Sequence, residues 1–392
     1  LCMDNFYSSG CVDRCTLGSD KVLINRRNVV TEVKRNYAAS KRFLCLALES
    51  RVVAAAMTLL GIERMEDQPK TSTFPESLQH LGKSERKNVL TNLAAKVVDQ
   101  FVLQKKTVAR MLQAKEDLEE EKLSLVTAPD GKFRCQEPSC RRTFRFNGKA
   151  KRDHEEKAHG IVKANVGLVV DNDDDMYNYQ CSLLEYLMLL KNFQDGVSEG
   201  DGARILRCWK FLQLYLKADG PSSRKYCLEG LYLSFQVHCL LSARESYRVI
   251  WNRSVKKKSG FGGNIPIDLA MEHYIRLVKL LMRKLGPNQT NRNILQRYLK
   301  AVGFTKTLLE DFDEHTGIIR RSGRHTKKAA LHDKAKIVEE LISSKALVPQ
   351  SKRKYAMYKD VKPTMLADFN FHLFYEWINV HKRDIAKKRK AR

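Results

Sequence analysis

The sequence predicts a mainly α-helical protein in which two helical bodies are separated by a small ββα module. Apolar residues recur at three- and four-residue spacing along most of the 392-residue chain, which is the period of an amphipathic helix. A short segment rich in Cys, His and basic residues interrupts this pattern near 131–160. Outside that segment no run reads as a convincing β-strand, and the length allows two or three domains.

The pattern divides the chain into five parts. We expect an N-terminal helical region over 1–126, the ββα module over 131–160, an acidic linker over 161–175, a helical domain over 176–316, and a basic region with a docking helix and a basic tail over 317–392.

The N-terminal region begins with an irregular polar segment, 1–27, and continues into helical spacing from Val29 to Leu60 that Gly61 ends in the usual C′ position. A long amphipathic helix follows from Glu85 to Leu123, roughly 60 Å long at 1.5 Å per residue. We expect this helix to pack in a bundle. An arm that binds a partner or forms a homodimer is the alternative, since its heptads are imperfect.

The ββα module carries the spacing of a zinc finger. Four residues separate Cys135 from Cys140, thirteen separate Cys140 from His154, and four separate His154 from His159. Thiolates and imidazoles in closely spaced pairs can form the closed tetrahedral shell that Zn²⁺ prefers, and Phe133 and Phe144 fall where such a finger keeps its apolar core. We therefore predict Zn²⁺ as the cofactor.

This finger is not expected to read a base sequence by itself. The helix positions that would face bases are roughly Asn147, Ala150 and Asp153, none of which is an arginine. Cations surround them instead and suit phosphates, which position a protein without specifying sequence. The predicted phosphate-binding residues of the finger are Lys149, Lys151, Arg152 and Lys157.

The charge of the chain favours a polyanionic partner. Its 71 Lys and Arg exceed its 45 Asp and Glu, which gives a formal net charge of +26. Two basic loops add phosphate-binding candidates, although the glycine-rich one lacks the Lys-Ser/Thr of a P-loop. The candidates are Lys256, Lys257, Lys258, Arg320, Arg321 and Arg324.

The remaining composition favours a nuclear protein in a reducing compartment. Most of the ten cysteines lie scattered in apolar helical stretches, which is typical of free thiols. The segment from Lys382 to Arg392 has seven Lys or Arg and suits nuclear import or nucleic-acid contact. The longest mostly apolar run, 52–62, is too short to span a bilayer, so we expect no membrane partner.

The second helical body contains four turn-separated helices before the glycine-rich loop and two after it. Asp201-Gly202 opens its second helix, Pro266 starts the first helix after the loop, and Gly286-Pro287 ends that helix. The acidic run that precedes this body (Asp171, Asp173, Asp174 and Asp175) could hold a divalent metal, but a solvated loop is the preferred interpretation.

Several ordered segments of this chain resemble a eukaryotic family, domain of unknown function 6589, in its animal members with a zinc finger. The segments are EGDGARILRCWKFLQLYLKADG (Glu199–Gly220), KYCLEGLYL (Lys225–Leu233), IWNRSV (Ile250–Val255), GGNIPIDLAMEHYIRLVK (Gly262–Lys279), SGRHT (Ser322–Thr326) and FYEWINVHK (Phe374–Lys382). The resemblance implies a transposon-derived origin, because many members look transposon-derived and fungal relatives resemble transposases with a ribonuclease-H-like core.

That origin raises an enzyme hypothesis. Two-metal phosphodiester chemistry needs converging carboxylates, for which Glu199, Asp201, Asp268 and Glu272 are candidates. All four lie at helix starts or on helices, whereas transposase cores carry their first acids on strands. Asp201 is more simply a helix N-terminal charge, and Glu272 an i,i+4 partner of Arg276. We therefore assign no catalytic residue.

The sequence as a whole predicts a zinc-binding, nuclear, nucleic-acid-binding protein of transposon-related origin that is not catalytic and contacts its ligand mainly through phosphates. Two alternatives remain open. One is a protein-interaction scaffold that uses the finger and the long helix, and the other is a transposase-like nuclease or its inactive remnant.

Overall fold

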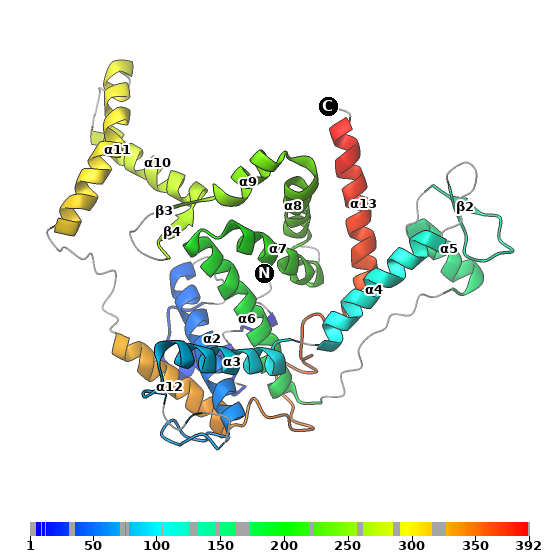
Figure 1. Cartoon of the computed structure of the whole chain (residues 1–392), viewed down its shortest axis with the longest axis horizontal. Coiled ribbons are helices and arrows are strands. Elements are labelled where there is room, and N and C mark those ends of the chain that lie inside the picture. The colour runs from blue at the N-terminus through cyan, green and yellow to red at the C-terminus, as the bar shows by residue number, and fades with distance from the viewer. Residues whose placement is uncertain are drawn as a thin grey trace. The chain divides into compact units, whose positions relative to one another are not determined.

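The computed structural model confirms the mainly α-helical class (Figure 1). It describes the chain outside residues 1–4, 9, 12, 31–35, 71–74, 76–77, 104, 125–131, 146–148, 162–172, 220–222, 257–261, 285–290, 316–326 and 391–392.

The described helices are α1 (Leu17–Leu23), α2 (Tyr37–Leu60), α3 (Lys83–Phe101), α4 (Lys105–Ser124), α5 (Lys149–His159), α6 (Asp175–Glu199), α7 (Gly202–Ala218), α8 (Arg224–Phe235), α9 (Ala243–Trp251), α10 (Ile267–Lys284), α11 (Arg292–His315), α12 (Lys327–Ser343) and α13 (Phe371–Lys390), with a π-helical turn over Gln236–Leu240. Two antiparallel hairpins accompany them: β1 (Phe133–Arg134) with β2 (Thr143–Phe144), and β3 (Ser254–Lys256) with β4 (Asn264–Pro266). The second hairpin corrects the expectation that strands occur only in the finger.

The chain forms two compact units that interleave in sequence. Unit 1 comprises Leu1–Met188, Phe211–Phe235 and Lys334–Arg392, and unit 2 comprises Leu189–Lys210 and Gln236–Asp333. The ββα module belongs to unit 1, as do both ends of the chain. These units differ from the linear parts that the sequence predicts, because helical spacing along the chain does not reveal which distant segments pack together.

The N-terminal segment is part of the core of unit 1, which corrects the prediction of an irregular polar segment over 1–27. Phe6, Tyr7 and Leu17 are buried. The backbone N–H of Leu17 donates to the Tyr179 hydroxyl over 3.1 Å, and that hydroxyl donates to the Phe6 carbonyl. A buried tyrosine on α6 therefore satisfies the backbone of a segment whose polar spacing masks its burial.

A buried charge pair joins α1 to α2. Arg51 of α2 and Asp20 of α1 are fully buried, and the Arg51 Nη1 lies 2.6 Å from the Asp20 Oδ2. Arg51 also donates through Nε to Gln180 Oε1 over 2.8 Å and through Nη2 to the Cys15 carbonyl over 2.9 Å. The guanidinium thus connects α1, α2 and α6 within one core.

Helix α2 is long and apolar enough, by length and composition alone, to cross a membrane. Half of its most apolar window is nevertheless buried inside the structure, and Arg51 in the same helix is ion-paired. Core helices of globular units pass the same length test, and the burial of α2 is of that kind. The apolar helix is longer than the run that the sequence indicated.

The predicted long helix is two helices, α3 and α4. Helix α3 ends at Phe101, which is buried together with Val97. Helix α4 packs against α13, where Arg110 donates to the Ala367 carbonyl over 2.6 Å and Tyr375 donates to the Met111 carbonyl over 3.3 Å. Because the two halves bury their apolar residues against different elements, a continuous arm does not form.

The acidic run binds the C-terminal segment within unit 1. Asp174 accepts two bonds from Arg353, over 2.8 and 2.6 Å, and caps α6 by accepting from the Tyr177 N–H. Asp175 accepts from the backbone N–H groups of Tyr355 and Val361, each over 3.1 Å. These carboxylates are therefore neither a metal site nor a solvated loop, whereas Asp171 lies outside the described residues.

Unit 2 is built from close backbone contacts and few buried side chains. A Cβ added to Gly202 at the start of α7 would lie 1.8 Å from the Ile250 carbonyl oxygen, so only glycine permits this approach to α9. Asn264 of β4 donates to the Ser198 carbonyl over 3.0 Å. Among the described residues of unit 2, the fully buried apolar side chains are Leu206, Cys208, Val237 and Ala270.

Candidate metal centre

The ββα module places its four candidate ligands from three local elements. Phe133 of β1 pairs with Phe144 of β2, and the Cys135 N–H donates to the Arg142 carbonyl over 3.1 Å, which extends the ladder to the first cysteine. The Cys140 N–H donates to the Glu137 carbonyl over 2.9 Å, which closes a tight turn. The two histidines lie near the end of α5.

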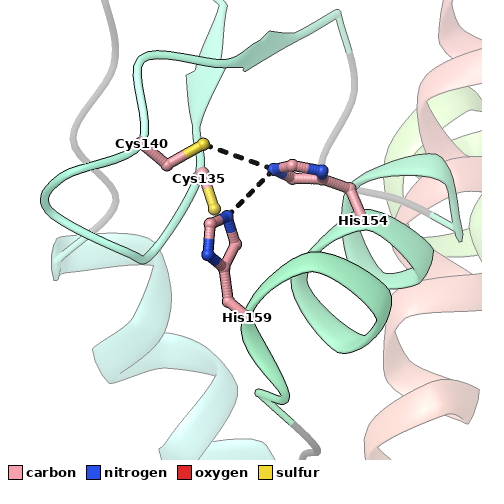
Figure 2. A group of neighbouring side chains, drawn as sticks. All are labelled: Cys135, Cys140, His154 and His159. Atoms are coloured by element: carbon pink, nitrogen blue, oxygen red, sulfur yellow. Dashed lines mark hydrogen bonds between the residues drawn. The ribbon is translucent and has the colours of Figure 1, made fainter.

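The four side chains converge on one point, as Figure 2 shows. One ligand atom from each of Cys135, Cys140, His154 and His159 lies within 4.8 Å of the others. The two histidine Nε2 atoms are 3.3 Å apart, and the Cys140 Sγ lies 3.3 Å from the His154 Nε2. The cluster brings together all four predicted ligands and could hold a metal ion.

The donor set and spacing fit a tetrahedral metal. Ideal Zn–N and Zn–S bond lengths imply ligand separations of about 3.4 Å for two nitrogens and about 3.6 Å for sulfur and nitrogen. The distances of 3.3 Å in the cluster lie close to these edges. The residues would hold such an ion through the Nε2 atoms of both histidines and both sulfurs.

Electrostatics keeps His154 in the form that a metal needs. Desolvation, with the nearby Arg142 and His159 charges, lowers the pKa of the His154 imidazole. Desolvation also raises the pKa of Cys135, and the neighbouring Cys140 adds to this shift. Metal binding deprotonates thiols, so a bound cation would supply the charge that stabilises both thiolates.

An aromatic and a guanidinium lie against the outer side of His154. The ring of Phe144 lies 5.4 Å from the His154 ring, and the Arg142 guanidinium lies 5.7 Å from the Phe144 ring. The Arg142 Nη1 is 3.3 Å from the His154 Nδ1. Phe144 therefore performs the core role predicted for it, while Arg142 is a neighbour that sequence spacing did not indicate.

Lys151 is not placed to contact phosphate, which corrects its predicted role. Its side chain is almost fully buried, with its Nζ 2.9 Å from the Glu155 Oε1, and Glu155 also accepts from the Gln136 N–H over 2.9 Å. The pair ties α5 to the loop after Cys135. The i,i+4 spacing of Lys151 and Glu155 is the sequence signal that could have revealed it.

Arg152 connects the module to the C-terminal helix. Its guanidinium forms an ion pair with Glu376 of α13, and His372 lies one turn earlier with its Nδ1 3.8 Å from the same carboxylate. The phosphate-binding role predicted for Arg152 is therefore replaced by a contact within unit 1. No local pattern in the sequence could have paired residues so far apart.

The other predicted phosphate-binding residues are spread along the chain. Lys157 is exposed on α5 and Lys256 is exposed on β3. Lys149 lies in the first turn of α5, and its side chain is outside the description. The predictions at Lys257, Lys258, Arg320, Arg321 and Arg324 lie outside the described residues.

The candidate carboxylates of the nuclease hypothesis have local partners or solvent. Glu199 forms an ion pair with Arg204 at 2.8 Å, and Asp201 accepts from the Arg204 N–H over 2.9 Å at the start of α7. Asp268 and Glu272 are exposed on α10. Within the described parts of the chain, the Cys and His cluster is the one group found with metal-binding spacing.

The fold and site define a mainly α-helical protein with an embedded ββα module whose Cys and His side chains could hold a metal. The chain belongs to the family of unknown function DUF6589, whose model matches residues 2–325. That match covers most of the chain and agrees with the resemblance seen in its ordered motifs. None of the curated proteins and none of the solved structures matches it.

Proposed function

We propose that this chain is a zinc-binding, nuclear protein that binds nucleic acid through phosphates and has no catalytic activity. The observation that carries the proposal is the four-residue cluster, because its donors and spacing suit Zn²⁺. A closed set of two thiolates and two imidazoles leaves no position for water or substrate, so the metal would be structural.

The contacts of α5 support a structural role for the finger. The Lys151–Glu155 pair is buried and Arg152 binds Glu376 of α13, so two of the four cations expected to face phosphate are engaged within unit 1. Of the base-facing positions, Ala150 cannot donate a hydrogen bond through its side chain and Asp153 would repel phosphate. The finger would thus anchor α13.

Nucleic-acid binding is supported by the charge that remains exposed. Cations on both the strands and the helix of the module face solvent, including Arg134, Arg141 and Lys157. Together with the formal net charge of +26, they favour a polyanion bound without base readout. The basic run over 382–392 supports nuclear import, and family membership is compatible with a transposon-related origin.

Metal content tests the zinc part of the proposal. We expect one zinc ion per purified chain by elemental analysis, and none in Cys140→Ser. Folding of a finger is linked to its metal. Hydrogen exchange in Cys140→Ser should therefore rise over 133–159 while α1, α2 and α6 keep their protection. Absence of zinc from a folded wild-type chain would refute this part.

Salt dependence tests the nucleic-acid part. Releasing counterions from several phosphate contacts makes the affinity for duplex DNA fall steeply with salt, by about 10³-fold or more between 50 and 200 mM for six contacts. Fluorescence anisotropy with a duplex of random sequence measures this slope. Lys157→Glu should weaken binding and Asp153→Asn should not. Weak, salt-insensitive binding would favour a scaffold instead.

A protein-interaction scaffold is the second candidate. Exposed aromatic and aliphatic side chains on α9 and α10, including Tyr247, Trp251 and Met271, favour it. The nuclease alternative has less support, because Glu199 and Asp201 already serve the start of α7. Mg²⁺- or Mn²⁺-dependent nicking that disappears in Glu272→Ala would restore it.

A further inference from the structure

Unit 2 leaves more apolar surface exposed than its core buries. Its described residues include four fully buried apolar side chains, whereas exposed ones are frequent on α10 and α11. Large contiguous apolar exposure on a folded unit marks a surface that binds another protein. The exposed side chains used here are Ile267, Met271, Ile275 and Leu280 of α10, and Leu299 and Phe304 of α11.

Helix α11 is the more open of the two helices. It contacts chiefly α10, and in Figure 1 (yellow) it crosses α10 and extends beyond it in both directions. Leu299 and Phe304 near its middle are 53% and 73% exposed. A helix of 24 residues with a bare apolar centre has room for a second helix of the same length.

The order of charges along α11 identifies the partner. By sequence, its cations all precede its acids: Arg292, Arg297, Lys300 and Lys306 come first, and Glu310, Asp311, Asp313 and Glu314 follow. Two such helices placed antiparallel bring the basic part of each beside the acidic part of the other. Placed parallel, they would repel at both ends. This pattern is complementary to itself.

A glycine stands where an antiparallel pair would cross. Gly303 is at the middle of α11, and a Cβ added there would meet no atom within 4 Å. Nothing in the described chain therefore requires glycine, although glycine is unfavourable inside a helix. Small residues let two helix backbones approach closely. About this centre Arg292 would lie opposite Glu314, and Arg297 within one position of Glu310.

From this arrangement we propose that a second copy of this chain packs on α11, antiparallel and crossing at Gly303, with the exposed face of α10 beside it. The interface is self-complementary, as a twofold homodimer requires. It lies on unit 2, away from the long N-terminal helix that the sequence offered as a dimer arm, which is broken into α3 and α4. The inference does not depend on zinc or nucleic acid.

Sedimentation equilibrium of the full chain with its charge variants tests the proposal. Wild type should form a concentration-dependent dimer. Reversing the basic end (Arg292→Glu with Arg297→Glu) or the acidic end (Glu310→Lys with Glu314→Lys) should weaken self-association about tenfold or more, because like charges then face each other. Combining all four substitutions in one chain should restore the dimer, and mixing the two singly reversed chains should give a heterodimer.

Gly303→Leu separates the interface from the fold. Because its side chain meets open space in the single chain, circular dichroism should be unchanged while the dimer is lost. Gly303→Ala serves as the milder variant. A wild-type chain that stays monomeric, or a dimer that none of these substitutions weakens, would overturn the proposal.

Discussion

Units 1 and 2 use their charged and apolar residues in opposite ways. Unit 1 buries charges in pairs that join distant segments, such as Asp20 with Arg51 and Asp174 with Arg353. Unit 2 keeps most of its charged side chains in solvent and leaves large apolar side chains exposed on α10 and α11. Unit 1 is thus held together by specific internal partners, whereas unit 2 presents a surface suited to an external one.

The largest effect should come from Arg51. Its replacement in Arg51→Met leaves the Asp20 carboxylate buried without its partner, which costs about 3–5 kcal/mol. Urea unfolding with hydrogen exchange should report the loss in α1, α2 and α6. Adding Asp20→Leu should recover most of it, because the pair is then replaced by apolar groups. No recovery would mean that the pair contributes more than internal charge compensation.

Asp174→Ala should have the next largest effect. It removes the cap of α6 and both bonds to Arg353, for an expected loss of about 2–3 kcal/mol. Limited proteolysis should then cut the segment 344–361 faster. Asp173→Ala is the matched control, because its carboxylate is exposed and a surface ion pair contributes about 1 kcal/mol or less. Equal effects would contradict the docking role of Asp174.

Unit 2 should instead be sensitive to backbone crowding. Gly202→Ala forces a Cβ against the Ile250 carbonyl and should destabilise α7 and α9 by about 1–3 kcal/mol. Gly303→Ala, in open space, should stabilise α11 slightly. Thermal unfolding followed by hydrogen exchange compares the two. A tolerated Gly202→Ala would show that α7 and α9 approach less closely than described.

Within the finger, burial should separate two lysines by a smaller amount. Lys151→Met leaves Glu155 buried without a cation and should weaken zinc affinity, by about tenfold for a contact that supports the ligand-bearing elements. Lys157→Met, on the exposed side of the same helix, should leave zinc affinity unchanged. Competition with a chromogenic chelator measures both, and the reverse ranking would contradict the assignment.

The sequence predicted what depends on local spacing. The helix starts near Gly202 and after Pro266, the end of α2 at Gly61 and the four-residue metal cluster all follow from patterns within a few dozen residues. Contacts between distant segments could not be predicted this way. The Arg152–Glu376 pair and the burial of Phe6 under Tyr179 depend on tertiary packing, so they reversed expectations for both segments.

The break between α3 and α4 teaches the same lesson. The residues around Val102 contain no proline or glycine, and one continuous helix is the natural prediction from them. The helix divides because Phe101 is buried at the end of α3 while Arg110 binds the carbonyls before α13. Packing against two elements overrides local propensity.

The central claim is that the finger is a structural zinc module and that nucleic acid is bound through phosphates. Random-site selection on double-stranded DNA, with zinc present and Cys140→Ser in parallel, tests it most directly. We predict bound pools without a recovered motif from both proteins. A motif recovered by the wild type and lost in Cys140→Ser would mean that the finger reads bases, which would contradict the account.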